Sequence, residues 1–329
     1  MTKERYGVLG KRFFITGGAG FIGASLVRRI IDDNDVVVYD NFHRNALQFT
    51  NLLNHPHLTV CEGDILDLAS VEKQIKGSHH IIHLASIAGV DTVLSMPVQT
   101  MEVALIGTHN LLRASRNLST IERFIDFSTS EVFGSFAFNA HESDPTPLGS
   151  VGEARWTYAV SKLATEHLTL NYHKAFGFPS LSIRPFNIFG PLQVGVGAIH
   201  TFVKRALRDE PIYIHNGGSQ IRSWCYIDDI IDGILLCLEK KEALGQAFNI
   251  GNPRNTLTIY NLAQTIIRLT DSKSEIVFTE KNIADVELRI PSTEKAKRLL
   301  GYEPKIDLEA GLIKTIEWYK KHGSRLSPG

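Results

Sequence analysis

The sequence has few cysteines, no excess of charge of either sign and no long apolar run. Its three cysteines, Cys61, Cys225 and Cys237, lack metal-ligand spacing, so we expect reduced thiols in a protein core. The 35 basic and 35 acidic side chains cancel, which leaves no broad attraction to nucleic acid or to an anionic membrane. No segment approaches the roughly 20 apolar residues of a membrane-spanning helix, and residues 1–7 show no apolar signal-peptide core. We therefore predict a cytoplasmic protein with no metal site and no nucleic-acid or membrane partner.

Internal repeats and low-complexity segments are also absent. The chain has 13 histidines, but their spacing does not place ligands on one helix face. We expect His55, His57, His79 and His80 at the surface or in loops. Function therefore has to be sought in local motifs.

A glycine-rich turn lies between a predicted strand and a predicted helix near the start of the chain. Residues 11–16 form a short apolar run typical of a buried strand, and residues 21–31 carry apolar side chains at helical spacing. Between them stands Gly17-Gly-Ala-Gly-Phe-Ile-Gly23. Glycines at these positions allow a tight turn and close approach of the backbone to a pyrophosphate at the helix N-terminus. The pattern predicts a dinucleotide-binding site.

A carboxylate follows the next predicted strand. Residues 35–40 form an apolar run that ends in Asp40, at the expected distance from the glycines to accept a hydrogen bond from an adenosine ribose hydroxyl. A negative charge at this position repels a 2′-phosphate. The sequence therefore favours NAD over NADP.

Tyr158 and Lys162 predict an acid/base group beside the nicotinamide. The two residues are one helical turn apart and share a face. A tyrosine phenol titrates near pH ~10, and the positive charge of the lysine favours the phenolate. Thr129, at the end of a predicted strand, can hydrogen-bond the reacting oxygen. Such a group can take a proton from a sugar or steroid hydroxyl while hydride leaves the same carbon.

Strands and helices alternate further along the chain. Apolar runs predict strands at 58–62, 79–86, 123–128 and 180–185, with a helix at 98–115. After Asn187 the pattern is mixed, with helices expected at 198–209, 227–238, 259–270, 293–300 and 308–322 and a strand at 211–215. Strands separated by helices form a parallel sheet covered on both faces, which binds ligands beyond the carboxyl ends of its strands.

We therefore predict an α/β fold with two parts. Residues 1–190 are expected to form a Rossmann-type doubly wound parallel sheet that carries the cofactor site and the catalytic residues. Residues 191–329 are expected to form a smaller mixed α/β C-terminal substrate lobe, with some elements crossing over. No linker rich in proline or serine separates the parts, so we expect one shared core.

Together these motifs resemble the extended short-chain dehydrogenases/reductases of the NAD-dependent epimerase/dehydratase family, which act on nucleotide sugars. The resemblance runs from about Phe13 to Tyr319 and is carried by the segments 16–23, 63–65, 83–86, 128–134, 184–191 and 221–229, together with Tyr158 and Lys162. In such enzymes tightly held NAD oxidises the sugar at C4, and the resulting ketone permits a second step.

The resemblance implies a set of site residues. The implied cofactor contacts are Gly17, Gly20, Phe21, Ile22, Gly23, Asp40, Asn41, Asp64, Ile65, Leu84, Ala85, Ser86, Tyr158, Lys162 and Pro185. The implied substrate contacts are Ser130, Glu131, Asn187, Arg222 and Arg289, with Asn187 and Arg222 at the diphosphate. The resemblance also implies a homodimer formed by the helices near residues 98–115 and 158–172.

The pair Ser130-Glu131 bears on the second step. Dehydratases of the family usually have Asp-Glu at this place, whereas the UDP-glucuronate decarboxylases, which this chain resembles most, have Ser-Glu. A 4-keto uronic acid is a β-keto acid and loses CO2 readily. We expect Arg289 to hold the carboxylate or an adjacent oxygen. We expect Glu131, if burial raises its pKa, to deliver or relay a proton.

Other second steps remain open. Ala88 stands where several 4-epimerases have a lysine, Ala104 replaces a common asparagine, and Asn282 lies near the place of a phosphate-binding arginine of many epimerases. The alternatives are a nucleotide-sugar 4-epimerase, of the UDP-glucuronate or UDP-glucose type, and then a 4,6-dehydratase. A non-catalytic NAD-binding protein is disfavoured because Thr129, Tyr158 and Lys162 are all present.

Overall fold

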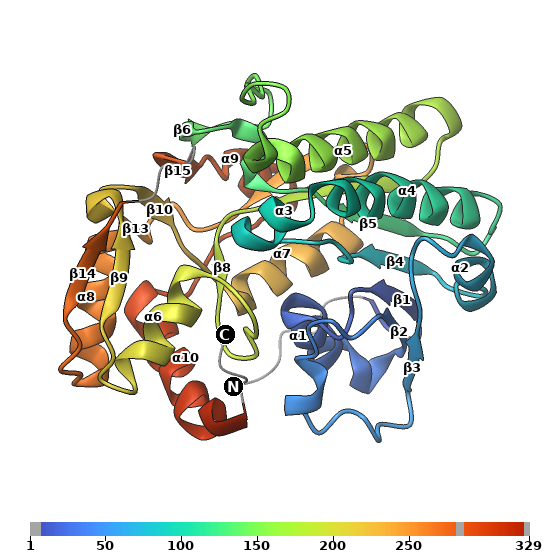
Figure 1. Ribbon diagram of the computed structural model, residues 1–329. Coiled ribbons are helices and arrows are strands. Elements are labelled where there is room, and N and C mark those ends of the chain that lie inside the picture. Colours follow the sequence, from blue (N-terminus) through green and yellow to red (C-terminus); the bar gives the residue numbers. More distant parts are fainter. Residues whose placement is uncertain (1–7, 281–285, 326–329) are drawn as a thin grey trace.

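A seven-stranded parallel sheet forms the centre of the molecule (Figure 1). The computed structural model describes residues 8–280 and 286–325. The strand order is β12-β7-β5-β4-β1-β2-β3, and every neighbouring pair is parallel. The strands are β1 (Arg12–Thr16), β2 (Asp35–Asp40), β3 (Leu58–Glu62), β4 (His80–His83), β5 (Arg123–Phe127), β7 (Ser180–Pro185) and β12 (Ala247–Ile250). The predicted Rossmann-type fold is confirmed.

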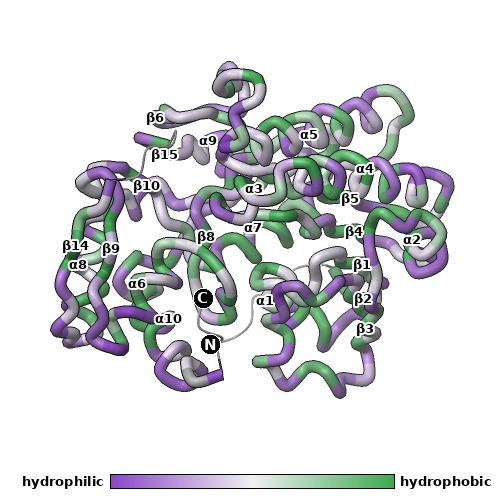
Figure 2. The backbone as a smooth tube through the Cα atoms, viewed as in Figure 1, coloured by the Kyte–Doolittle hydropathy of each residue, from purple (hydrophilic) through white to green (hydrophobic). Residues whose placement is uncertain are grey.

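Helices cover both faces of this sheet, as Figure 1 shows. One face carries α2 (Leu68–Gln74), α4 (Pro97–Arg116) and α5 (Thr157–Phe176), and the other carries α1 (Phe21–Ile30) and α7 (Ile227–Glu239). Within β1, Phe13 and Ile15 belong to the core on the α1 side and Phe14 to the core on the α4 side. Successive side chains of a strand point to opposite faces, so a strand covered on both sides is apolar throughout. Figure 2 shows mainly hydrophobic residues along α7.

A smaller lobe lies beyond the carboxyl ends of the strands. Its main sheet has the order β13-β10-β15-β6, and two short pairs, β11-β8 and β14-β9, accompany it. These strands are β6 (Phe136–Ala140), β8 (Ile188–Phe189), β9 (Ile212–His215), β10 (Ile221–Ser223), β11 (Cys225–Tyr226), β13 (Thr256–Thr258), β14 (Ile276–Thr279) and β15 (Leu288–Pro291). The remaining helices are α3 (Val90–Ser95), α6 (Ala198–Ala206), α8 (Ile259–Thr270), α9 (Glu294–Leu300) and α10 (Leu308–His322).

The two parts exchange strands. β6 precedes residue 190 but pairs within the smaller sheet, whereas β12 follows residue 190 and forms an edge of the main sheet. One continuous apolar cluster runs from Phe13 in the main sheet to Tyr319 in α10. The chain thus has one shared core across both parts.

Some local predictions differ from the structure. The predicted strand 79–86 ends at His83, because the chain then turns into the loop that lines the central cavity. His80 is buried beside Phe13, contrary to the expected surface position, because β4 is an inner strand covered on both faces. Cys61 is only half-buried because it lies on the edge strand β3, whereas the other two cysteines are buried.

The described residues contain neither a helix suited to a membrane nor a cluster of metal ligands. No helix in residues 8–280 and 286–325 combines the length and the apolar character that crossing a membrane requires. In the same ranges, no group of three or more histidine, cysteine or acidic side chains could hold a metal ion.

Candidate active site

A cavity of about 530 Å³ lies at the carboxyl ends of the central strands. It is lined by nearly all of the predicted site residues: Gly17, Gly20, Phe21, Ile22, Gly23, Asp40, Asn41, Asp64, Ile65, Leu84, Ala85, Ser86, Thr129, Ser130, Glu131, Tyr158, Pro185, Asn187 and Arg289. Lys162 and Arg222 are the two predicted residues that do not line it. The topology therefore brings together side chains that are far apart in the sequence.

A second, larger hollow of about 890 Å³ lies between α5, α9 and the start of β12. None of the predicted site residues line it. Its lysines and arginines stand among the carboxylates of Glu142, Glu166 and Glu294, so charges of both signs are mixed there. This hollow therefore contains none of the residues on which the predicted chemistry depends.

The glycine turn between β1 and α1 forms a cradle that only glycine permits. Gly17 has φ +68°, and a Cβ on it would lie 2.6 Å from the backbone nitrogen of Ala85. A Cβ on Gly23 would lie 2.5 Å from the Cα of Gly18. The N-cap of α1 is Gly20, and no side-chain hydrogen bond caps this helix within the described part of the chain, so its first N–H groups are available to an anion. This cradle fits the pyrophosphate of a dinucleotide.

Asp40 and Ser86 face the same cavity. The carboxylate of Asp40 accepts hydrogen bonds from the N–H groups of Ala19 (2.9 Å) and Phe42 (2.8 Å), one on each oxygen. Burial raises the pKa of Asp40, and these N–H groups oppose the rise. Each oxygen keeps a further lone pair for a ribose hydroxyl. The buried hydroxyl of Ser86 lines the cavity close to the Tyr158 phenol, a position that suits contact with a bound molecule.

Tyr158 and Thr129 meet at the inner end of the cavity. Thr129 follows β5 and accepts a hydrogen bond from the Glu131 N–H (3.2 Å). Tyr158 lies in the first turn of α5. Burial and then the negative charge of Glu131 raise the pKa of the Tyr158 phenol, while the nearby hydroxyls of Thr129 and Ser86 oppose that rise.

Lys162 lies behind Tyr158, fully enclosed, with its Nζ 3.9 Å from a carboxylate oxygen of Asp126. Burial lowers the pKa of Lys162, and Asp126 opposes this. The phenol of Tyr158 nevertheless has a pKa above its usual value in the polypeptide alone. The physical reason is that desolvation of the phenol dominates its pKa, and the ammonium stands beside a carboxylate of its own.

Glu131 lies between two arginines. Its Oε2 accepts a hydrogen bond from Arg155 Nη1 (2.7 Å), and its Oε1 is 3.7 Å from Arg289 Nη1. The side chains of Arg155 and Arg289 are 7% and 5% exposed. Burial by itself raises the pKa of Glu131, but the charges of Arg289 and Arg155 outweigh it, so the pKa of Glu131 lies below its usual value. The condition under which Glu131 was expected to deliver or relay a proton, a raised pKa, is therefore not met, and Glu131 is ionised at neutral pH.

The two residues predicted at the diphosphate differ in position. Asn187 lines the cavity, and its side-chain amide donates to the Ser223 carbonyl (3.0 Å). Arg222 stands beside Arg289 in adjacent strands, but its guanidinium donates to the carbonyls of Ile221 (3.0 Å) and Val286 (2.5 Å). It contributes positive charge near Glu131 without lining the cavity.

The residues on which the alternatives depend are placed only in part. Ala88 lines the cavity, and its carbonyl accepts from Arg44 (2.9 Å). Ala104 is buried in α4, and Asn282 lies outside the described residues.

Sequence reasoning did not assign Arg155 or Asp126 to the site. Arg155 stands three residues before Tyr158 and outside the motifs that predicted the site. Asp126 gave a clearer signal, because it is a carboxylate within the otherwise apolar core of β5.

The model of the NAD dependent epimerase/dehydratase family matches residues 13–251. The chain belongs to this family. Among its relatives, the UDP-N-acetyl-alpha-D-glucosaminuronate decarboxylase of Bacillus cytotoxicus is 31% identical, with 94% of this chain and 98% of the relative covered. The UDP-glucuronic acid decarboxylase 3 of Arabidopsis thaliana is 32% identical, with 92% and 86% covered.

Solved structures of this family share the whole fold. The UDP-glucuronic acid 4-epimerase of Bacillus cereus, in complex with UDP-glucuronic acid and NAD, has a TM-score of 0.86 and 28% identity, with 94% of this chain and 99% of that chain covered. The dTDP-glucose 4,6-dehydratase DesIV of Streptomyces venezuelae, with NAD bound, has a TM-score of 0.87 and 26% identity, with 96% and 99% covered. This protein is therefore an enzyme of an NAD-dependent family, and the glycine cradle, Asp40 and Ser86 fit NAD.

Proposed function

We propose that this protein decarboxylates a UDP-linked uronic acid through a 4-keto intermediate. The observation that carries the proposal is the buried cluster of Arg155, Glu131 and Arg289 beside Tyr158. The guanidinium groups of Arg155 and Arg289 both border the cavity, and arginine binds carboxylates through charge-assisted, often bidentate hydrogen bonds. A sugar carboxylate accepts such bonds, whereas a neutral hexose offers only hydroxyl groups.

Each residue of the inner cavity has a proposed role. When bound, NAD supplies the hydride acceptor for C4. Tyr158 accepts the proton of the C4 hydroxyl, Thr129 holds the reacting oxygen, and Lys162 supplies positive charge behind the phenol. Loss of CO2 then breaks the bond between C5 and the carboxyl carbon; the electron pair passes into an enolate, which takes a proton at C5 from water to give the 4-ketopentose. Ionised Glu131 fixes Arg155 and Arg289 around the carboxylate and does not act as the proton donor.

The relatives support the substrate class. Two decarboxylases named for UDP-linked uronic acids each match more than nine-tenths of this chain at 31% and 32% identity. Ser130 and Glu131 line the cavity directly after Thr129, in the order expected for decarboxylases. UDP-glucuronate and UDP-N-acetylglucosaminuronate are therefore the substrates to examine.

A uronate 4-epimerase is the second candidate, and the likeness to the Bacillus cereus enzyme favours it. The arginine cluster would hold the same carboxylate, and hydride would return to the other face of the ketone. The two reactions differ in their products and not in the recognition of the acid group.

The deciding experiment is incubation of the purified protein with each UDP-uronate, with and without NAD, followed by proton NMR and trapping of CO2. Released CO2 together with a UDP-pentose or UDP-4-ketopentose supports the decarboxylase. A C4-epimerised UDP-uronate without CO2 makes the protein a 4-epimerase. Turnover of UDP-glucose alone contradicts both. Tyr158→Phe is the control, because it removes the acid/base group and leaves the cofactor cradle intact.

We also infer that the enzyme is a cytoplasmic homodimer. The three cysteines are free thiols, which suits a reducing compartment. Helices α4 and α5 pack side by side and expose Val98, Ile106 and Val160, as expected of a surface that a second copy covers. Sedimentation equilibrium tests the dimer, and a mass of one chain would contradict it.

A further inference from the structure

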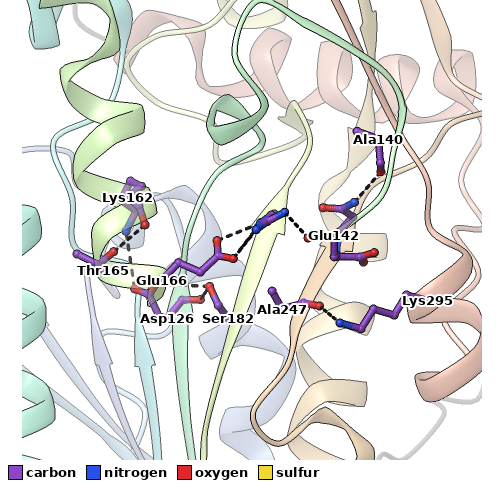
Figure 3. A network of polar contacts seen from close by, with 11 residues as sticks. Asp126, Ala140, Glu142, Lys162, Thr165, Glu166, Ser182, Ala247 and Lys295 are labelled. Carbon is purple, nitrogen blue, oxygen red and sulfur yellow. Dashed lines mark hydrogen bonds and ion pairs between the residues drawn. The ribbon is translucent and has the colours of Figure 1, made fainter. Parts of the chain in front are cut away.

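A buried carboxylate lies beneath the proposed catalytic pair. Asp126 on β5 is fully enclosed, and its Oδ1 is 3.9 Å from Lys162 Nζ. Lys162 is itself only 1% exposed. Figure 3 shows Lys162 on α5 facing Asp126, with Ser182 on the other side of the carboxylate. An ammonium and a carboxylate thus face each other without access to water.

The surroundings leave Asp126 as the counter-charge of Lys162. Glu166, one turn further along α5, is occupied by Arg184, whose Nε and Nη2 donate to its carboxylate at 2.7–3.0 Å. In the described part of the chain, Asp126 is the one carboxylate within 4.0 Å of Lys162 Nζ.

The other neighbours of this pair carry no charge. Ser182 Oγ on β7 lies 3.4 Å from Asp126 Oδ2, and Thr165 approaches from α5. His83 on β4 is near Lys162, but burial keeps its pKa well below the usual value, and its ring nitrogens are held by Thr16 and Thr108. Removal of Asp126 would therefore leave the ammonium with the more weakly acting Glu166, which is itself bound by Arg184.

We propose that Asp126 is a positioning residue, which keeps Lys162 charged behind Tyr158 and thereby sets the pH range of proton transfer. A lysine enclosed without a counter-charge loses its proton, because desolvation disfavours the charged form. A neutral Lys162 no longer supports the phenolate. Asp126 thus acts through Lys162 and touches neither substrate nor cofactor. The effect of Asp126 on catalysis rests on the proposed roles of Tyr158 and Lys162. Its effect on the charge state of Lys162 is independent of those roles.

The buried pair also predicts an acid limb of activity. Burial raises the pKa of Asp126 to about 6, although Lys162 opposes the rise. Below that pH the carboxylate is neutralised, and the support for the ammonium is lost. Activity should therefore fall as the pH decreases through about 6.

The first test is substitution Asp126→Asn, which keeps the shape and removes the charge. The titration of Lys162 is followed by NMR of its labelled side chain in the full-length protein with NAD. We expect its pKa to fall by roughly one unit or more. If Asp126→Asn folds and the pKa of Lys162 is unchanged, the proposal is overturned. This measurement needs no substrate, so it stands apart from any failure of the proposed reaction.

The second test is the pH profile of kcat with the nucleotide sugar that the wild type turns over. We expect the kcat of Asp126→Asn to be roughly tenfold below that of the wild type at pH 7.5, and part of this difference to disappear at higher pH. The matched control is Asp229→Asn, because Asp229 is also a buried carboxylate with a raised pKa but binds the backbone of Lys305 and Ile306. The control is expected to lose stability without a shifted profile.

A conservative variant keeps the test decisive if Asp126→Asn does not fold. Asp126→Glu retains the negative charge and should preserve most of the wild-type titration of Lys162. A folded Asp126→Glu protein in which Lys162 is neutral at pH 7.5 contradicts the proposal. A uniform loss of kcat at every pH in Asp126→Asn also contradicts it, because a purely structural role gives that result.

Discussion

Replacement of Arg155 by methionine tests the basis of the proposed substrate class. Arg155 donates a 2.7 Å hydrogen bond to Glu131, and its side chain is 7% exposed. The substitution keeps an unbranched side chain of similar reach and removes one positive charge. One of the two guanidinium groups that border the cavity is then gone, so the preference of the cavity for an anionic substituent should weaken.

The expected size of the effect follows from the burial of the charges. Truncation of one partner of a buried, hydrogen-bonded charge pair weakens binding by about 2–5 kcal/mol, and a hydrogen bond to a charged group contributes about 1.5–3 kcal/mol. Glu131 keeps Arg289 as a partner, so the lower part of this range applies. A loss of about 2–3 kcal/mol corresponds to roughly a 30- to 160-fold weaker affinity for a UDP-uronate.

The assay is isothermal titration calorimetry with UDP-glucuronate and UDP-glucose, on protein loaded with NAD. For Arg155→Met we expect the large loss of affinity for UDP-glucuronate and less than about a fivefold loss of affinity for UDP-glucose. Arg155→Lys should give an intermediate affinity for UDP-glucuronate, because lysine keeps the positive charge but lacks the planar guanidinium group that binds a carboxylate with two hydrogen bonds. Arg298→Met, an exposed arginine of α9 outside the cavity, is the control with the same change of net charge. Equal losses for both sugars in Arg155→Met would refute the reasoning.

Further outcomes are expected. Tyr158→Phe should lower kcat at least about 100-fold, with NAD binding retained in calorimetry. Because the pKa of Tyr158 is raised, the kcat of the wild type should increase from pH 7 to pH 9 in a buffered series. A flat pH profile counts against the role of the phenol. Gly17→Ala should abolish NAD binding in a fluorescence titration, because its Cβ would lie 2.6 Å from the Ala85 nitrogen at φ +68°; retained binding contradicts the cradle. Glu166→Gln should lower the free energy of unfolding in urea by about 3–5 kcal/mol, because Arg184 then loses its buried bidentate carboxylate partner. An unchanged urea midpoint contradicts this stabilising role of the Arg184–Glu166 pair.

The sequence predicted best what is encoded locally. The strand β1, the glycine turn and α1 follow one another within about 20 residues, and turn chemistry together with apolar spacing determines them. The same holds for α8 and α10, whose observed ends agree with the apolar pattern. The cavity lining was predicted because parallel strands bring their carboxyl ends to one edge of the sheet.

What the sequence could not predict depends on distant partners. The pKa of Glu131 is lowered because η4 (Ala154–Trp156) and β15 bring Arg155 and Arg289 to it, and neither arrangement follows from spacing. Arg222 has the right position in the chain, but its guanidinium binds the carbonyl of Val286. The pKa of Tyr158 also depends on how deeply the phenol is enclosed, which a motif does not specify.

The exchange of β6 and β12 has a consequence for engineering. A cut at residue 190 removes β12 and bares the backbone hydrogen-bonding groups of β7, while the smaller sheet loses β6 from the edge at β15. Bare strand edges of this kind promote aggregation. When the substrate lobe of one family member is grafted onto the main sheet of another, residues 136–140 should therefore come with the grafted lobe, and residues 247–250 should stay with the recipient sheet. A chimera joined at a single point would have two mismatched sheets, however well its active-site residues were chosen.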